Sequence, residues 1–254
     1  MVNVLILRVA GTNCDVETEW AFKLAGAKAE RIHINRIIEN KKILEKYQVL
    51  VIPGGFAYGD DIAAGKVLAN QIKYKLWSEI CKFIESKKVI IGICNGFQVL
   101  VKAGILPWTG EQKVTLTWNN SARFEDRWVY LKVEKSNSPF FKGLPEVIRL
   151  PVAHAEGKFI SENKDILAKI KKEKLIILRY CDEKGNFAGY PYNPNGSVEN
   201  IAGICNKTGL VFGMMPHPER CILKYHFPDW TSCNYKNKFA YGFKIFKNVV
   251  EYFL

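Results

Sequence analysis

The stretch VIIGICNGFQVL, residues 89–100, places a cysteine two residues from a glycine on either side, directly after a run of β-branched residues. The run predicts a buried strand, and the apolar residues that follow Asn95 predict a helix that begins at once. A tight strand-to-helix turn lifts the residue at its apex out of the sheet, and only small neighbours tolerate the strained backbone. Cys94 is therefore either a nucleophile at such an apex or a buried structural thiol, which is the usual state of a free cysteine.

Short apolar runs alternate with segments of helical period through the first half of the chain. Three runs predict buried strands: NVLILRV (3–9), QVLVIP (48–53) and KKVIIGI (87–93). Asn13 or Asp15 is predicted to cap a helix that runs to Leu24, and two further helices are predicted over 66–84 and 95–103. This alternation predicts an α/β fold with a doubly wound, mostly parallel sheet flanked by helices.

Two glycine-rich turns, 53–59 and 92–96, come directly after predicted strands. Ligands of doubly wound sheets bind beyond the carboxyl ends of the strands. We therefore expect a functional site at this edge of the sheet, with both turns in it.

The pattern changes from about residue 107. Short strands are predicted over WVYLKVE (128–134), LIILRY (175–180) and GLVFGMMP (209–216), and a closing helix over 238–253. Turns rich in proline, asparagine and glycine, such as YPYNPNGS (190–197), separate them. We interpret this half as an antiparallel-rich extension of one domain that spans residues 1–254.

Composition sets outer limits on function. The 254 residues are 48% hydrophobic and 24% charged, as in ordinary globular proteins. No apolar run reaches the roughly 18–20 residues of a membrane span, so no membrane association is expected. The seven cysteines include no CxxC pair, which favours reduced thiols and a cytoplasmic location. Neither His154 nor His217 has a partner at zinc-ligand spacing, so no metal site is expected.

The net charge of +12 raises the question of nucleic-acid binding. The lysines are dispersed among acidic residues, as in KKEK (171–174), and no long basic block with interleaved aromatics occurs. We interpret most of them as solvated faces and some as contacts to an acidic protein partner, and we expect no nucleic-acid binding.

The segment MMPHPER, residues 214–220, offers a base for the cysteine. His217 follows a predicted strand and lies between two prolines that restrict the backbone. Glu219 comes two residues later and projects to the same side if the segment is extended. A carboxylate beside an imidazole fixes its tautomer while the other nitrogen faces a thiol. Taken alone, His217 could equally be an exposed loop histidine.

Two backbone amides could stabilise an oxyanion. Asn95 begins the helix after Cys94, and the positive end of that helix also favours a thiolate. Gly55, in IPGGF (52–56), can bring its amide close to a substrate without a Cβ in the way. The rival interpretation of residues 54–66 as a phosphate-binding loop fails, because Lys66 is followed by Val67 rather than serine or threonine.

Together these residues resemble those of class I, triad-type glutamine amidotransferases. Within that class they resemble the glutaminase subunits of phosphoribosylformylglycinamidine synthase, and the resemblance implies a flavodoxin-like glutaminase fold. It covers nearly the whole chain and rests on GTNCD (11–15), GGFAYGDD (54–61), GICNGFQVL (92–100), NNSARFEDRW (119–128), VAHAEGKF (152–159), NPNGS (193–197), IAGICN (201–206) and GMMPHPER (213–220).

The resemblance implies a role for each catalytic residue. Cys94 attacks the side-chain amide of L-glutamine, His217 protonates the departing ammonia and Glu219 orients His217. A γ-glutamyl thioester forms and is then hydrolysed. Gly55 and Asn95 match the oxyanion donors of the class.

The same resemblance implies four substrate-binding positions, which are Phe56, Gln98, His154 and Glu156. Gln98 lies one helical turn after the nucleophile and matches a residue that contacts glutamine in this class. His154 and Glu156 belong to HAEG, which borders the active site. For His154, a second catalytic base and a structural or partner-contact role both stay open.

The resemblance further implies partners and cofactors. A larger synthetase subunit would bind ATP and magnesium, and a small subunit would bridge the two. This chain would carry no cofactor of its own, in keeping with the lack of a phosphate loop.

Two departures and one rival enzyme class bear on this interpretation. Val9-Ala10 and Ala57 differ from the residues usual in the family, but neither position belongs to the triad. Peptidase-like and chaperone-like relatives with a cysteine turn commonly have histidine directly after the nucleophile. Asn95 occupies that position here, which favours the glutaminase.

Overall fold

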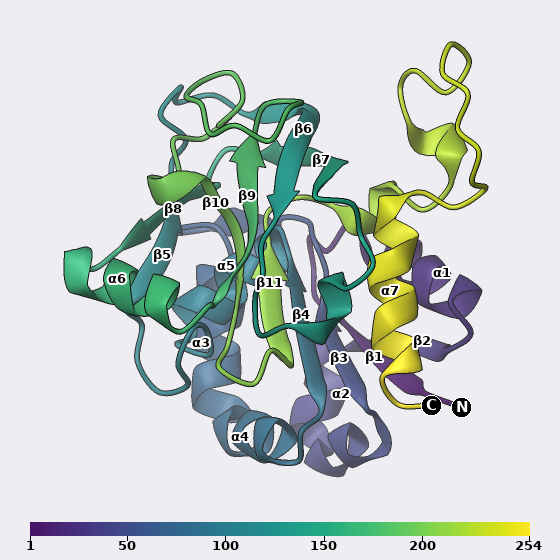
Figure 1. Ribbon diagram of the computed structural model, residues 1–254. Helices are drawn as coiled ribbons and strands as arrows, with labels where there is room; N and C mark the ends of the chain where they lie inside the picture. The colour runs from purple at the N-terminus through teal and green to yellow at the C-terminus, as the bar shows by residue number, and fades with distance from the viewer.

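Nine strands form one sheet, in the order β2-β1-β3-β4-β11-β10-β9-β6-β7, in the computed structural model, which describes all residues from 1 to 254 (Figure 1). Five neighbours pair in parallel: β2 (Lys28–His33), β1 (Asn3–Arg8), β3 (Val49–Ile52), β4 (Val89–Ile93) and β11 (Val211–Met214). Antiparallel pairs add β10 (Ile201–Cys205), β9 (Ile176–Cys181), β6 (Glu125–Val133) and β7 (Val147–His154). A separate small sheet pairs β5 (Val114–Thr117) with β8 (Lys158–Ser161). The predicted α/β fold with an antiparallel-rich second half is therefore confirmed.

Helices flank the parallel half of the sheet, as predicted. Near the two termini, α1 and α7 pack against each other, while α5 packs on β4, β11 and β3 with α3 beside it (Figure 1). The seven helices are α1 (Asp15–Leu24), α2 (Ile34–Glu39), α3 (Lys66–Lys75), α4 (Trp77–Glu85), α5 (Asn95–Lys102), α6 (Lys164–Lys172) and α7 (Tyr241–Glu251). None of them has the length and apolar character needed to cross a membrane.

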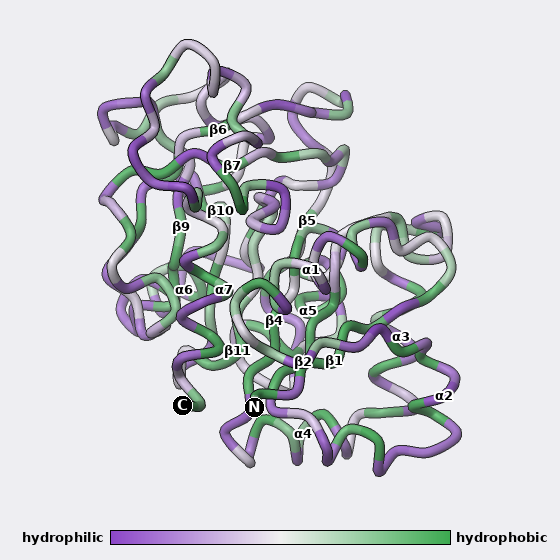
Figure 2. The backbone as a smooth tube through the Cα atoms, turned by 90° about the vertical axis from the view of Figure 1, so that its right-hand side faces the viewer, coloured by the Kyte–Doolittle hydropathy of each residue, from purple (hydrophilic) through white to green (hydrophobic).

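Burial follows the hydropathy of the sequence. Every residue of β4 is buried, as expected for a central parallel strand with helices on both sides. The helix α4 buries Ile80 and Phe83 and exposes its polar face, so its tube alternates between green and purple in Figure 2. The strands of the parallel half thus form because they are apolar throughout, and the outer helices because they are amphipathic.

Two predicted details of the helices are wrong. The single helix over 66–84 is interrupted at Leu76, which has φ −128° and ψ 8° and separates α3 from α4. The helix α1 is capped at Cys14, with no hydrogen bond from a capping side chain. The Asp15 carboxylate pairs instead with Arg8 at 2.8 Å and with Arg31 at 3.4 Å.

Three strands of the large sheet were not predicted from the sequence, namely β2, β7 and β10. β2 is KAERIH, an edge strand whose exposed positions carry charged side chains, so its apolar signal is weak. β7 is also an edge strand, and its buried residues alternate with half-buried ones. β10 is a buried five-residue strand with a glycine at its centre.

The register of the strands brings three turns to one edge of the sheet. Ile52 pairs with Gly92, and Met214 pairs with Ile93, so β3, β4 and β11 end side by side. β7 also reaches this edge, where its Pro151 carbonyl accepts a hydrogen bond of 2.8 Å from the His217 amide. The segments after these four strands therefore surround one site.

Candidate active site

Cys94 occupies the apex of the turn between β4 and α5. It has φ 49° and ψ −104°, a conformation that costs a side-chain-bearing residue about 1–3 kcal/mol. Hydrogen bonds hold it there, from its amide to the Met214 carbonyl (2.7 Å) and from the Gln98 amide to its carbonyl (3.1 Å). A Cβ on Gly96 would lie 1.8 Å from the Ile52 carbonyl oxygen, so only glycine fits beside the strand. The turn thus has the strained form predicted for a nucleophile.

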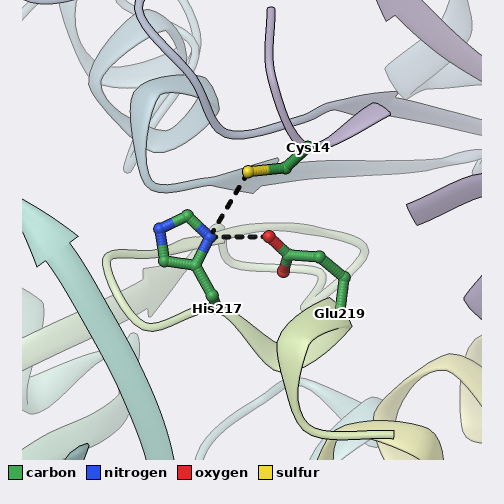
Figure 3. Close-up of side chains that lie close together, drawn as sticks. All are labelled: Cys14, His217 and Glu219. Atoms are coloured by element: carbon green, nitrogen blue, oxygen red, sulfur yellow. Dashed lines mark hydrogen bonds and ion pairs between the residues drawn. The ribbon is translucent and has the colours of Figure 1, made fainter. Parts of the chain in front are cut away.

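His217 and Glu219 form a buried pair (Figure 3). Nδ1 of His217 lies 2.6 Å from Oε1 of Glu219, so the carboxylate accepts a hydrogen bond from the N–H group at Nδ1. Burial alone would lower the pKa of His217, but the charge of Glu219, with a smaller contribution from Cys94, holds that pKa well above its ordinary value. Nε2 is buried without a hydrogen bond, which leaves it to exchange a proton with a reacting group.

A second cysteine lies on the Nδ1 side of the same imidazole. Sγ of Cys14 is 3.9 Å from Nδ1 of His217 (Figure 3). The same sulfur accepts a hydrogen bond of 3.1 Å from Arg220. Burial raises the pKa of the Cys14 thiol. Cys14 was not among the predicted site residues, because no local feature of the sequence distinguishes it from the other cysteines. Cys14 does not line the pocket described below, whereas Cys94 does.

Cys14, His217 and Glu219 offer ligand atoms that all lie within 4.8 Å of one another. The donor set does not suit a cation, however. Nδ1 of His217 is already hydrogen-bonded to Glu219, and the positively charged Arg220 guanidinium lies beside the sulfur of Cys14. Hydrogen bonds and ion pairs within the protein account for this cluster.

A pocket of about 290 Å³ opens at the carboxyl edge of the sheet. Its lining contains most of the predicted site residues: Gly55, Phe56, Cys94, Gln98, His154 and Glu156. Asn95 and the His217–Glu219 pair lie outside this lining. Asp60 and Trp118 also line the pocket and were not predicted.

The peptide between Gly54 and Gly55 has a fixed orientation. The Gly54 carbonyl accepts hydrogen bonds from the amides of Asn13 (3.2 Å) and Cys14 (3.1 Å). In a trans peptide the following N–H points the opposite way, so the Gly55 amide is directed away from that loop. Gly55 has φ +145°, and a Cβ there would lie 2.6 Å from the Asn13 nitrogen, which explains the need for glycine. Gly55 therefore lines the pocket with an amide that no backbone group occupies.

The Asn95 amide is the second available donor. Asn95 is the first residue of α5, and the first amides of a helix have no partner within it. Its side chain is fully used, because Nδ2 donates to Asp60 (2.8 Å) and Gln98 (3.0 Å) while Oδ1 accepts from the Ala57 amide (3.1 Å). The backbone N–H is the group that remains for a ligand.

A buried ionic network ties the segment 57–65 to α5. Nζ of Lys102 donates to the Ala64 carbonyl (2.6 Å) and pairs with Glu156 (3.3 Å), whose carboxylate also accepts from the Ala64 amide (3.2 Å). Burial lowers the pKa of Lys102 and raises that of Asp60. Gln98 donates to the Glu156 carbonyl at 2.6 Å. Gln98 and Glu156 thus shape the wall of the pocket through contacts within the protein.

His154 is held as a neutral side chain. Oδ1 of Asn119 accepts from the Gly157 amide (3.0 Å) and lies 3.2 Å from Nδ1 of His154, which places the proton on Nδ1. Burial and, secondarily, the nearby His217 lower the pKa of His154 to about 3. The ring packs on Gly157, where a Cβ would lie 2.3 Å from it. These contacts favour the structural alternative for His154 over a second base.

The NPNGS motif (193–197) holds the HAEG segment (154–157) and the residues that follow it through hydrogen bonds. Asn195 donates to the Gly157 carbonyl (2.8 Å), and Ser197 accepts from the Phe159 amide (2.9 Å). Both side chains are buried. The motif therefore acts through HAEG and not by direct contact with the pocket centre.

Comparison with known proteins agrees with this geometry. The family profile of the CobB/CobQ-like glutamine amidotransferase domain matches residues 1–253. A phosphoribosylformylglycinamidine synthase subunit PurQ of Dehalococcoides mccartyi is 45% identical over 99% of this chain and 97% of its own, and one of Methanococcus maripaludis is 42% identical over 98% and 97%.

A solved structure shares the whole fold. The structure titled PurLQS from Thermotoga maritima matches with a TM-score of 0.76 and 30% identity, over 100% of this chain and 99% of that one. The strained cysteine turn, the buried histidine–glutamate pair and these relatives agree: the chain belongs to the glutamine amidotransferase family, and within it to the PurQ subunits of phosphoribosylformylglycinamidine synthase.

Proposed function

We propose that this chain hydrolyses L-glutamine at Cys94 and passes the ammonia to a synthetase subunit that converts formylglycinamide ribonucleotide to formylglycinamidine ribonucleotide in purine biosynthesis. The observation that carries the proposal is the strained Cys94 turn at a pocket, close enough to His217 to help raise the pKa of that imidazole, whose buried carboxylate partner lies 2.6 Å away. The match to the family profile over residues 1–253 supports a single amidotransferase domain.

In the first half of the reaction, the Cys94 thiolate attacks the side-chain carbonyl carbon of glutamine. The carbonyl oxygen becomes an oxyanion that accepts hydrogen bonds from the Gly55 and Asn95 amides. His217 gives its Nε2 proton to the departing nitrogen, so ammonia leaves and a γ-glutamyl thioester remains. Glu219 stabilises the protonated imidazole before this step.

In the second half, water attacks the thioester carbon. Nε2 of His217 takes a proton from the water, and the same two amides hold the second oxyanion. The carbon–sulfur bond then breaks, which releases glutamate and returns the Cys94 thiolate and the protonated His217. Phe56, Gln98, His154 and Glu156 line the space for the rest of the glutamine.

The mouth of the pocket supports a partner that covers it. Phe56, Ile62 and Trp118 line the pocket and are 44%, 88% and 61% exposed. Phe124 is 49% exposed, and its ring lies 6.2 Å from that of Phe56. Exposed apolar residues gathered in this way mark interaction sites. We place the synthetase subunit, with its ATP and magnesium, over this rim, where ammonia would enter it without meeting bulk water, and a small subunit bridging the two.

The seven cysteines are all free, which supports a reducing, cytoplasmic setting. Part of the +12 charge would face an acidic surface of the synthetase. In that case complex formation weakens as salt is raised.

The decisive test is Cys94→Ala in the reconstituted complex with its synthetase. Glutamine-dependent synthesis should be lost, while ammonia-dependent synthesis stays at the wild-type rate. Cys205→Ala, which removes a buried thiol of β10, is the matched control and should retain both. Glutamine-dependent synthesis by Cys94→Ala would refute the assignment of the nucleophile.

A further inference from the structure

Cys14 contacts the catalytic imidazole from the side opposite to the pocket. Its sulfur lies 3.9 Å from Nδ1 of His217, and Arg220 donates to that sulfur at 3.1 Å. Cys14 is 1% exposed and does not line the pocket, so it cannot reach a substrate there. Any effect of Cys14 on the reaction must pass through His217 and its neighbours.

The backbone of Cys14 is held from both sides. Its carbonyl accepts hydrogen bonds from Oγ1 of Thr18 (2.6 Å) and from the Thr18 amide (3.2 Å) at the start of α1. Its amide donates to the Gly54 carbonyl (3.1 Å), which belongs to the peptide that orients the Gly55 N–H. One residue therefore touches both the oxyanion peptide and the proton-transfer pair.

Gly54, Cys14 and the His217 ring are packed closely together. A Cβ on Gly54 would lie 2.7 Å from Cε1 of His217 and 3.2 Å from Sγ of Cys14. Gly54, Cys14 and the imidazole are thus in mutual contact, and a change in one moves the others. The sulfur contacts both the Arg220 guanidinium, at 3.1 Å, and Nδ1 of the imidazole, at 3.9 Å.

We propose that Cys14 is a positioning residue of the glutaminase reaction, which keeps His217 aligned with Glu219 and the oxyanion peptide and holds the Arg220 cation away from them. The proposal rests on the proposed function of Cys94 and His217. Without the sulfur, Arg220 can approach Glu219 and compete for its carboxylate. The imidazolium then loses part of its stabilisation, and the imidazole loses a packing contact.

The experiment compares Cys14→Ala, Cys14→Ser and the control Cys205→Ala in the complex with the synthetase. Cys14→Ala should lower kcat with glutamine about tenfold, with KM within about twofold of wild type. Because the pKa of His217 falls, the alkaline limb of the pH profile should move to lower pH by about half a unit or more. Cys14→Ser, whose hydroxyl still accepts from Arg220, should recover part of both effects.

The outcomes separate this proposal from the proposed function. Wild-type kcat and an unshifted pH profile in Cys14→Ala would overturn the role of Cys14. Equal loss of ammonia-dependent synthesis in both Cys14 variants would also overturn it, because it would show a purely structural role. Retained glutamine use by Cys94→Ala would instead refute the nucleophile, whatever the Cys14 variants do.

Discussion

Two buried histidines near the active site have opposite electrostatic settings. His217 has a carboxylate 2.6 Å from Nδ1, and its pKa is raised well above the ordinary value. His154 has only the neutral Asn119 amide at 3.2 Å, so burial lowers its pKa to about 3. The nature of the group that faces Nδ1 therefore decides which histidine can hold a proton, and in the proposed reaction that proton goes to the leaving ammonia.

The low pKa of His154 makes the stability of the protein sensitive to acid. The folded-state pKa of about 3 lies below the unfolded value of about 6.5. Between these values the unfolded chain binds a proton that the folded chain does not, so His154 costs stability as pH falls below about 6.5. The cost grows by about 1.4 kcal/mol per pH unit and is absent at higher pH.

His154→Gln removes this contribution. Urea unfolding of both proteins from pH 7 to pH 4 should show that the stability of the wild type over the variant shrinks by about 1.4 kcal/mol per pH unit below pH 6. Because the slope is compared, the baseline cost of the substitution does not matter. A constant difference across this range would show that His154 titrates normally in the folded protein.

At the scale of the elements, the turn between β4 and α5 depends on close contact with β3. The Gly96 backbone packs so tightly that an added Cβ would lie 1.8 Å from the Ile52 carbonyl oxygen. Backbone atoms of a central strand cannot move aside cheaply. The helix that supports Cys94 therefore depends on a glycine at this contact as well as on its buried side chains.

Gly96→Ala should destabilise the protein by about 3 kcal/mol or more, because β3 and α5 must separate. Gly189→Ala is the matched control, since a Cβ there meets nothing within 4 Å, and its effect should stay within about 1 kcal/mol. Thermal and urea unfolding measure both. Equal stability of the two variants would mean that the turn is more adaptable than its contacts indicate.

At the scale of the whole molecule, the antiparallel half brings β7 across the end of the parallel half. The Pro151 carbonyl accepts from the His217 amide (2.8 Å), and the Cys94 sulfur lies 3.6 Å from the Ala153 carbonyl. The pocket is thus built between the two halves of one sheet, and its mouth is rimmed by exposed apolar side chains. That rim is where we place the synthetase.

Phe124→Glu tests this docking surface without altering a residue that lines the pocket. The charge should weaken association with the synthetase by about tenfold or more, because it must be desolvated at an apolar contact. Tyr74→Glu, on α3 and 79% exposed, is the control and should bind normally. Analytical ultracentrifugation or calorimetry measures both affinities. Wild-type affinity of Phe124→Glu would place the partner on another face.

The amino-acid sequence alone predicts the central parallel strands β1, β3 and β4, the strained cysteine turn and the shared direction of the His217 and Glu219 side chains. Buried strands, glycine turns and side chains two residues apart are local features, and their physical requirements can be read from neighbouring residues. The predicted residues that line the pocket, Phe56, Gln98, His154 and Glu156, came from resemblance to a family, and only their place in the pocket is now described.

Packing in three dimensions sets the break at Leu76, the place of β2, β7 and β10, and the contact of Cys14 with an imidazole 203 residues away. Those features depend on which surfaces pack together. A polar edge strand or one buried thiol among seven cysteines looks ordinary until its distant partner is in place. The physical reason is that burial and electrostatics at such a site are set by packing, which local sequence patterns do not contain.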